Sequence, residues 1–195
     1  MGEAIKNNKY YSFKEYLELE KHSELRHEYF YGEVFALAGT TIKHNDIIFN
    51  AVSVLKNTLK GKNCKINFES VKVKIKAKEH YTYPDIVVSC DKNEDDPLTI
   101  KYPILIIEVL SDATRRYDRG KKFQIYKQIP DFKHYLLIEQ DFCLVDCFTR
   151  KGDLWYHKSY TEESDTINLE HLDLNIPVKR IYENIEYDKE IKPSF

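Results

Sequence analysis

Glycine is scarce in this chain, and its few copies are not spaced as a phosphate-binding loop requires. The six glycines among 195 residues form neither a GxGxxG nor a GxxxxGK pattern, so neither a dinucleotide-binding motif nor a P-loop is predicted. A GxSxG element, which carries the nucleophile of α/β-hydrolases, is also missing. These absences exclude the commonest motif-based assignments.

Long apolar runs are missing as well. No run approaches the roughly 18–20 residues that a membrane-spanning helix needs, and the first residues, MGEAIKNNKYYSF, lack the apolar segment of a secretory signal. Lys6 stands where the myristoylation pattern requires serine or threonine. We therefore expect a cytoplasmic protein without a membrane partner.

The cysteines and histidines are not spaced as in known metal-binding motifs. Cys64, Cys90, Cys143 and Cys147 form no CxxC pair and have no histidine at zinc-finger distance, so we expect four reduced thiols and no zinc site. HxxxH and HExxH are absent too. His44 stands at the start of a predicted helix, where it is either a site residue or a polar residue of the first turn.

Charge is nearly balanced, with 30 Lys and Arg against 32 Asp and Glu and a formal net charge of −2. This balance excludes a protein that binds nucleic acid through overall basic charge, but it does not exclude a local basic face. The 42% apolar content is typical of soluble globular proteins. The length predicts one domain over residues 1–195.

Helix and strand signals alternate along the chain. A capping box predicts a helix over 12–21, and alternation around a central glycine predicts a hairpin over 26–39. Apolar residues recur at helical spacing over 44–59, and a further helix is predicted over 118–128. Strands are predicted at CKINF, SVKVKIKA, DIVVSC, PILIIEVL, HYLLIEQ, FCLVDCF and DLWYHKSY. This order predicts an α/β fold with a mixed central β-sheet flanked by α-helices.

Glu108 is a lone carboxylate inside the apolar run PILIIEVL. Burying an ionised carboxylate is costly unless it is paired or bound to a metal. If DIVVSC and PILIIEVL pair as an antiparallel hairpin with Cys90 opposite Pro103, Asp85 falls opposite Glu108, with β-carbons roughly 4.5–5.5 Å apart. Carboxylates at this spacing repel unless a proton or a cation lies between them. Mg²⁺ or Mn²⁺ suits such hard oxygen ligands.

Two other interpretations of this pair stay open. Asp85 follows Pro84 and is compatible with an ordinary turn residue, and Glu108 is compatible with a charge on an open sheet face. Paired carboxylates also serve glycoside hydrolases, although a lysine directed at the pair would have no role there.

A run of basic residues follows at 115–127, and such a run is commonly a solvated helix face. Helical periodicity separates two adjacent lysines in it. Lys122 shares the apolar stripe of Ile125 and Tyr126, whereas Lys121 aligns with the polar Gln124. Because a lysine is almost never buried unpaired, Lys122 is predicted to point toward Asp85 and Glu108.

The third candidate for a functional site, after the carboxylate pair and the basic run, is the alternating stretch SVKVKIKAK. Its alternation places every second side chain on one face. The lysines of that face are Lys72, Lys74, Lys76 and Lys78. They form either a basic ribbon for a phosphate backbone or the protection of an edge strand against aggregation, and the second interpretation is slightly favoured.

These segments carry a family resemblance. YPDIVV, IIEVLS, TRRYDRGKK and KHYLLIEQD occur in this order with the expected spacing. They resemble the Uma-type family of bacterial restriction-endonuclease-like proteins, within the PD-(D/E)xK nuclease superfamily. HEYFYGEV is similar to that family's Tyr-Glu-x-x-Asp-Gly-Glu element, with Tyr31 in place of the usual acid. His44 matches a histidine that commonly opens the family's next helix.

The resemblance, over roughly residues 12–160, implies a mixed sheet flanked by helices and metal-dependent hydrolysis of phosphodiesters. It implies Asp85 and Glu108 as ligands of Mg²⁺ and Glu28 as an additional acid. The superfamily's lysine should stand two residues after Glu108, where this chain has Leu110. In the Uma-type pattern it is displaced onto the following helix, which corresponds to Lys122.

The leading hypothesis is therefore a divalent-metal-dependent endonuclease that acts on DNA, with Asp85, Glu108, Lys122 and Glu28 as catalytic residues. The alternative is a nucleic-acid-binding or regulatory protein that keeps the fold without cleavage. A homodimer is an expectation from restriction-like nucleases, which often cut both strands as dimers.

Overall fold

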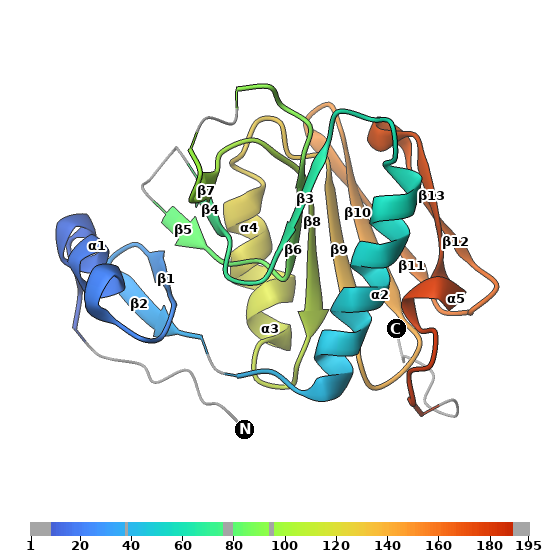
Figure 1. The fold of residues 1–195 in the computed structure, drawn as a ribbon, viewed down its shortest axis with the longest axis horizontal. Helices are drawn as coiled ribbons and strands as arrows, with labels where there is room; N and C mark the ends of the chain where they lie inside the picture. The colour runs from blue at the N-terminus through green and yellow to red at the C-terminus, as the bar shows by residue number, and fades with distance from the viewer. Residues whose placement is uncertain (1–8, 38, 76–79, 94–95, 189–195) are drawn as a thin grey trace.

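A six-stranded sheet forms the centre of the molecule (Figure 1). The computed structural model describes residues 9–37, 39–75, 80–93 and 96–188. The strands, in sheet order, are β11 (Leu154–Tyr160), β10 (Val145–Lys151), β9 (His134–Glu139), β8 (Pro103–Leu110), β6 (Ile86–Ser89) and β3 (Lys65–Phe68). Strands β8 and β9 run parallel and the other neighbours antiparallel, so the sheet is mixed.

Helices cover both faces of this sheet (Figure 1). Because side chains alternate along a strand, Leu105 and Ile107 of β8 face the core formed with helix α2 (Ile42–Thr58). Ile106 faces the other core, formed with α4 (Phe123–Tyr126). The predicted α/β fold with a mixed central sheet flanked by helices is confirmed. Glu108 has the same alternation as Ile106 and lies on the α4 side.

The helical segment after β8 differs from the single helix predicted over 118–128. It begins with α3 (Arg115–Tyr117), widens into the π-helical turn η1 (Asp118–Lys122) and ends as α4. π-helical turns are uncommon and frequently lie at functional sites.

A second sheet joins the N-terminal part of the chain to the middle. Its order is β2 (Glu33–Ala36), β1 (His27–Phe30), β5 (His80–Thr82), β4 (Lys72–Ile75) and β7 (Thr99–Ile100). The predicted hairpin is confirmed, and Gly32 at its turn has φ +87°, where an added Cβ would lie 3.0 Å from Tyr10. Helix α1 (Phe13–His22) begins with both hydrogen bonds of the predicted capping box.

Strand β4 corrects the preferred interpretation of the alternating lysines. Over residues 72–75 it pairs with β5 on one side and β7 on the other, so it is not an edge strand. Lys72 Nζ lies 3.9 Å from Glu20 and 5.4 Å from the ring centre of Tyr81, and Lys74 lies over the same ring. Lys76 and Lys78 fall outside the described residues.

The C-terminal part contains elements that the sequence patterns did not indicate. Strands β12 (Thr166–Leu169) and β13 (Leu174–Pro177) form a separate pair joined by the 3₁₀ turn η2 (Glu170–Leu172), and α5 (Val178–Ile181) follows. Their apolar side chains pack into the core on the α2 side of the central sheet. No helix within the described residues is long and apolar enough to cross a membrane.

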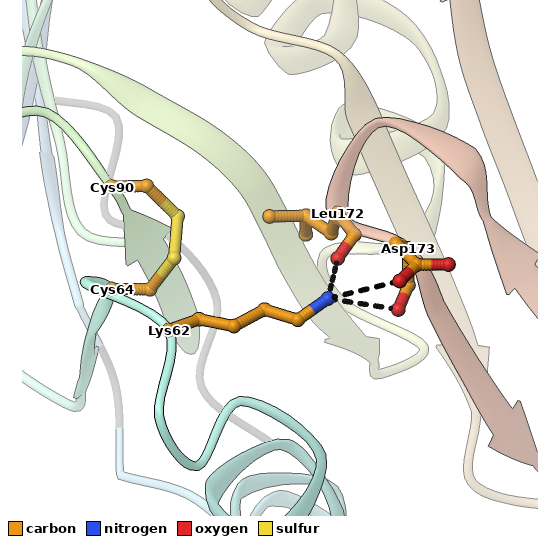
Figure 2. The surroundings of a disulfide bond; sticks show 5 residues. All are labelled: Lys62, Cys64, Cys90, Leu172 and Asp173. Carbon is orange, nitrogen blue, oxygen red and sulfur yellow. Dashed lines mark hydrogen bonds and ion pairs between the residues drawn. A yellow bond between two sulfur atoms is a disulfide. The ribbon is translucent and has the colours of Figure 1, made fainter.

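A disulfide joins Cys64 to Cys90, so the expectation of four reduced thiols is wrong for these two residues (Figure 2). The bond lies one residue beyond the last pair of the β3–β6 ladder, Lys65 with Ser89. Cys143 and Cys147 are free thiols. Disulfides are typical of oxidising compartments, and cytoplasmic location stays a prediction.

Lys62 fixes the loop that carries Cys64 (Figure 2). Its ammonium donates hydrogen bonds to the carbonyls of Leu172 and Asp173, in the connection between β12 and β13. The disulfide and this lysine therefore attach the loop after α2 to two different sheets.

Reduction of the disulfide is expected to lower the free energy of unfolding by about 3 to 4 kcal/mol in the chain-entropy model, because the bond joins residues 26 apart in the unfolded chain. Urea unfolding with and without a dithiol reductant measures the difference. Reductant should not change the urea-unfolding midpoint of the double variant Cys64→Ser/Cys90→Ser. An unchanged midpoint for the reduced wild type would contradict the assignment.

Candidate active site

A buried lysine lies among three carboxylates. Lys122 Nζ is 2.9 Å from Glu108 Oε1, 3.1 Å from Glu28 Oε1 and 3.5 Å from Asp118 Oδ1. All four residues are at most 5% exposed. The carboxylates come from β8, β1 and η1, so separate parts of the chain converge on one ammonium group.

The predicted difference between the two lysines of η1 is confirmed. Lys122 is buried, together with Asp118 one helical turn before it. Lys121 points elsewhere: its Nζ lies 2.6 Å from Glu33 Oε2, and its side chain is 41% exposed. The helical periodicity did not predict the contact of Lys121 with Glu33 on β2.

Asp85 lies opposite Glu108, as the hairpin register predicts. Ile86 pairs with Ile107, which places the preceding Asp85 across from Glu108. The Asp85 amide nitrogen lies 3.4 Å from Glu108 Oε2. The other end of the predicted register is wrong by one residue, because a bulge after Val88 pairs Ser89 with Pro103.

The two carboxylates of this pair differ in exposure and in partners. The Asp85 side chain is 24% exposed, and its Oδ2 accepts a 2.7 Å hydrogen bond from the Val109 amide. Glu108 is buried, and its Oε1 accepts a 3.0 Å hydrogen bond from the Tyr126 hydroxyl. Solvent therefore reaches the pair from the side of Asp85.

Three groups at this site were not assigned a role from the sequence. The helical periodicity placed Tyr126 on the same stripe as Lys122 but gave it no role, and Asp118, four residues before Lys122, could have been found in the same way. The main-chain amide of Tyr83 donates a 3.0 Å hydrogen bond to Glu28 Oε1, and a main-chain donor leaves no sequence signal.

His44, whose role the sequence left open, is part of the site. Its Nε2 lies 2.9 Å from the carbonyl oxygen of Val109 and 3.4 Å from Asp85 Oδ2. Thr41 caps α2 by accepting a hydrogen bond from the His44 amide. Burial disfavours a charged imidazole, but hydrogen bonding and attraction to Asp85 outweigh it and raise the pKa of His44.

Negative charge exceeds positive charge at the site. Burial raises the pKa of Glu108 well above its ordinary value, and the neighbouring acids raise it further against the opposing effect of Lys122. Burial also raises the pKa of Asp118. For Lys122, burial favours the neutral form, but Glu108 and Glu28 outweigh it and raise the pKa. A bound cation would relieve this imbalance.

The donor set suits a hard divalent cation held by few protein ligands. Within the described ranges, no group of three or more His, Cys, Asp and Glu residues is arranged to hold a metal ion. Asp85 and Glu108 offer two facing carboxylates. Mg²⁺ commonly takes only one or two carboxylates and completes its shell with water and substrate oxygens, so the pair fits Mg²⁺ or Mn²⁺.

Part of the basic run has a structural role. Arg115 Nη2 lies 2.8 Å from Glu139 Oε2, and Arg119 bonds both Glu139 and Asp146. Both acids are buried at the end of β9 and the start of β10. These arginines neutralise buried carboxylates and hold α3 and η1 against the sheet.

Comparison with known proteins gives concordant results. The family model Uma2, described as "Putative restriction endonuclease", matches residues 13–179. An uncharacterized protein of Synechocystis sp., slr1290, is 33% identical over 176 residues, which cover 89% of this chain and 92% of that protein. Another from the same organism, sll1609, is 29% identical over 153 residues, or 77% of this chain and 86% of that one.

A solved structure shares the fold. The crystal structure of "a putative nuclease belonging to DUF820" from Anabaena variabilis superposes with a TM-score of 0.72 at 20% identity, covering 88% of this chain and 97% of that one. At this identity the likeness concerns the fold alone. The family model spans most of the sequence, and this chain therefore belongs to the Uma2 family of restriction-endonuclease-like proteins.

Proposed function

We propose that this protein is a divalent-metal-dependent endonuclease that hydrolyses phosphodiester bonds in DNA. The observation that carries the proposal is the buried Lys122 held by Glu28 and Glu108, with Asp85 across the strand pair from Glu108. A buried ion cluster contributes little to stability compared with apolar packing, and clustered perturbed pKa values are typical of functional sites. Family membership and fold support the same conclusion.

Asp85 and Glu108 would hold Mg²⁺ or Mn²⁺. The bound ion would supply Lewis-acid polarisation of the scissile phosphate and a lowered pKa for an attacking water. Tyr126 and Lys122 fix one oxygen of Glu108, and the Val109 amide fixes one oxygen of Asp85. The pair is thus oriented before substrate arrives.

Lys122 would orient the attacking water or neutralise the charge that develops on the phosphate. Glu28 is the second acid on its ammonium, and the Tyr83 amide holds that carboxylate in turn. Glu28 therefore acts on the reaction through the position of Lys122. Asp118, one turn away on η1, contributes a third contact.

Cleavage of supercoiled plasmid DNA tests the proposal. Wild-type protein should nick or linearise the plasmid with Mg²⁺ or Mn²⁺ and stop when a chelator is added. Asp85→Ala should reduce cleavage to background because the partly exposed carboxylate proposed as a metal ligand is lost. Asp153→Ala, at the exposed turn between β10 and β11, should cleave like the wild type. Full metal-dependent activity of Asp85→Ala would exclude Asp85 as a ligand.

The alternative is a protein that binds nucleic acid or regulates a partner without cleavage. The observation that favours it is the ion pair between Lys122 and Glu108, because it already engages one oxygen of a carboxylate proposed as a metal ligand. A wild-type protein that binds DNA but leaves it intact with Mg²⁺, Mn²⁺ and Co²⁺ would support this alternative. A homodimer stays a prediction, to be checked by the mass of the particle in solution.

A further inference from the structure

We propose that His44 is a positioning residue that sets the orientation of the Asp85 carboxylate. The inference rests on the proposed function in that Asp85 is taken as the partly exposed acid that binds the metal. His44 itself is buried in the first turn of α2, and its Nε2 contacts Asp85 and the carbonyl of Val109, near the end of β8.

A gap in the strand ladder creates the need for this histidine. Ile86 pairs with Ile107, so continuing the register places Pro84 opposite Val109. Proline has no amide hydrogen to donate, and the Val109 carbonyl therefore lacks a main-chain partner on this side. A buried carbonyl without a donor is costly. His44 Nε2, 2.9 Å away, supplies the donor.

Asp85 and His44 together replace the missing ladder pair. Asp85 Oδ2 accepts from the Val109 amide at 2.7 Å, while His44 Nε2 donates to the carbonyl of the same residue. The two side chains are themselves 3.4 Å apart at Oδ2 and Nε2. Nε2 must carry a hydrogen to donate to the Val109 carbonyl. This N–H group therefore also presents partial positive charge to the Asp85 carboxylate oxygen.

The next residue of α2 fixes the main chain of Asp85. Asn45 Nδ2 donates a 2.7 Å hydrogen bond to Glu69 Oε1, and the Glu69 amide donates to the Asp85 carbonyl at 3.1 Å. The first turn of α2 therefore holds the side chain of Asp85 through His44 and its backbone through Glu69.

The start of α2 is anchored to β8 independently of His44. The Thr41 hydroxyl donates to Gln140 Oε1 at 3.2 Å, and Gln140 Nε2 donates to the Leu110 carbonyl at 2.9 Å. Loss of the imidazole should thus leave α2 in place. Loss of the imidazole removes the hydrogen-bond donor to the Val109 carbonyl and the contact that limits rotation of the Asp85 carboxylate.

Three variants separate positioning from simple packing. Glutamine can place its amide nitrogen where Nε2 lies, whereas the shorter asparagine and alanine cannot. Asn50→Ala serves as the matched control, because Asn50 lies on the same helix and bonds the carbonyls of Ile181 and Glu183 away from the site. Two readouts are used: hydrogen exchange of the Val109 amide in metal-free protein, and Mn²⁺ affinity by calorimetry.

His44→Ala and His44→Asn should speed exchange of the Val109 amide at least tenfold and weaken Mn²⁺ binding by about 10- to 100-fold, the usual effect of removing a residue that orients a ligand. His44→Gln should restore both toward wild type, and Asn50→Ala should change neither. Equal Val109 exchange in wild type and His44→Ala would overturn the inference, as would a glutamine variant no better than alanine. A wild type that binds no Mn²⁺ would refute the proposed function, whereas the exchange result decides the positioning by itself.

Discussion

Lys122→Met is expected to lose cleavage, whereas Lys121→Met is expected to keep it. The ammonium of Lys122 lies within 3.1 Å of both Glu108 and Glu28, whereas that of Lys121 bonds Glu33 near the surface. Removing a preorganised charge that stabilises a transition state costs about 10²- to 10³-fold in kcat. Single-turnover cleavage of a labelled duplex measures the rate.

Lys122→Met should also lower the free energy of unfolding more than Lys121→Met does. Lys122→Met leaves three buried carboxylates without their cation, and breaking a buried pair from one side costs about 3–5 kcal/mol. Lys121→Met removes a partly exposed pair worth about 0–1 kcal/mol. Rates are therefore compared at a temperature where circular dichroism shows all variants folded, with Lys122→Arg as the variant that keeps the charge. A folded Lys122→Met that cleaves at the wild-type rate would contradict the assigned role.

Glu108→Gln is expected to abolish metal-dependent cleavage and to stabilise the metal-free protein at neutral pH. Burial and the adjacent acids raise the pKa of Glu108 in the folded state, so ionising this carboxyl costs folding free energy. Glutamine keeps an oxygen that can accept from Tyr126 and Lys122, and it carries no charge. Cleavage assays and urea unfolding measure the two effects, which have opposite directions.

The stabilisation should depend on pH in one direction. A raised folded-state pKa means that the wild type keeps its full stability below the ordinary glutamate value of 4.5 and loses it as pH rises toward the raised value. The variant lacks this titration, so its advantage should be absent near pH 4 and grow toward pH 8. Glu183→Gln, at a half-exposed position, should show no such trend. An advantage that is constant or shrinks with pH would contradict the raised pKa.

Local patterns predicted the parts of the site that lie within one helical segment or between two strands joined by one loop. The helical period separated Lys122 from Lys121, and it survives the π-helical turn because the wider turn still leaves Asp118 and Lys122 on one buried side. The assumed antiparallel register predicted that Asp85 faces Glu108, because the pairs from Ile86 with Ile107 to Val88 with Leu105 follow that register and only the end next to the loop is shifted. These relations join residues of one helix or of two strands that follow each other in the chain, so few alternative arrangements compete with the predicted one.

Relations between distant segments could not be predicted in the same way. The disulfide needs Cys64 and Cys90 to face each other, which follows only once β3 pairs with β6. Glu28 entered through the family resemblance alone, since nothing in its own strand indicates that the hairpin packs beside η1. The contact of His44 with Asp85 depends on the packing of α2 against the end of β8. Each is a tertiary arrangement with no repeat along the sequence.

Calorimetric titration of Mn²⁺ into the wild type and the Asp85→Asn/Glu108→Gln double variant tests the central claim most directly. The double variant replaces only the two facing carboxylates and keeps Lys122 and Glu28, and circular dichroism checks that it is folded. Saturable binding by the wild type that disappears in the double variant is the predicted result. Equal binding by both proteins, or no binding by the wild type, would contradict a metal site at Asp85 and Glu108.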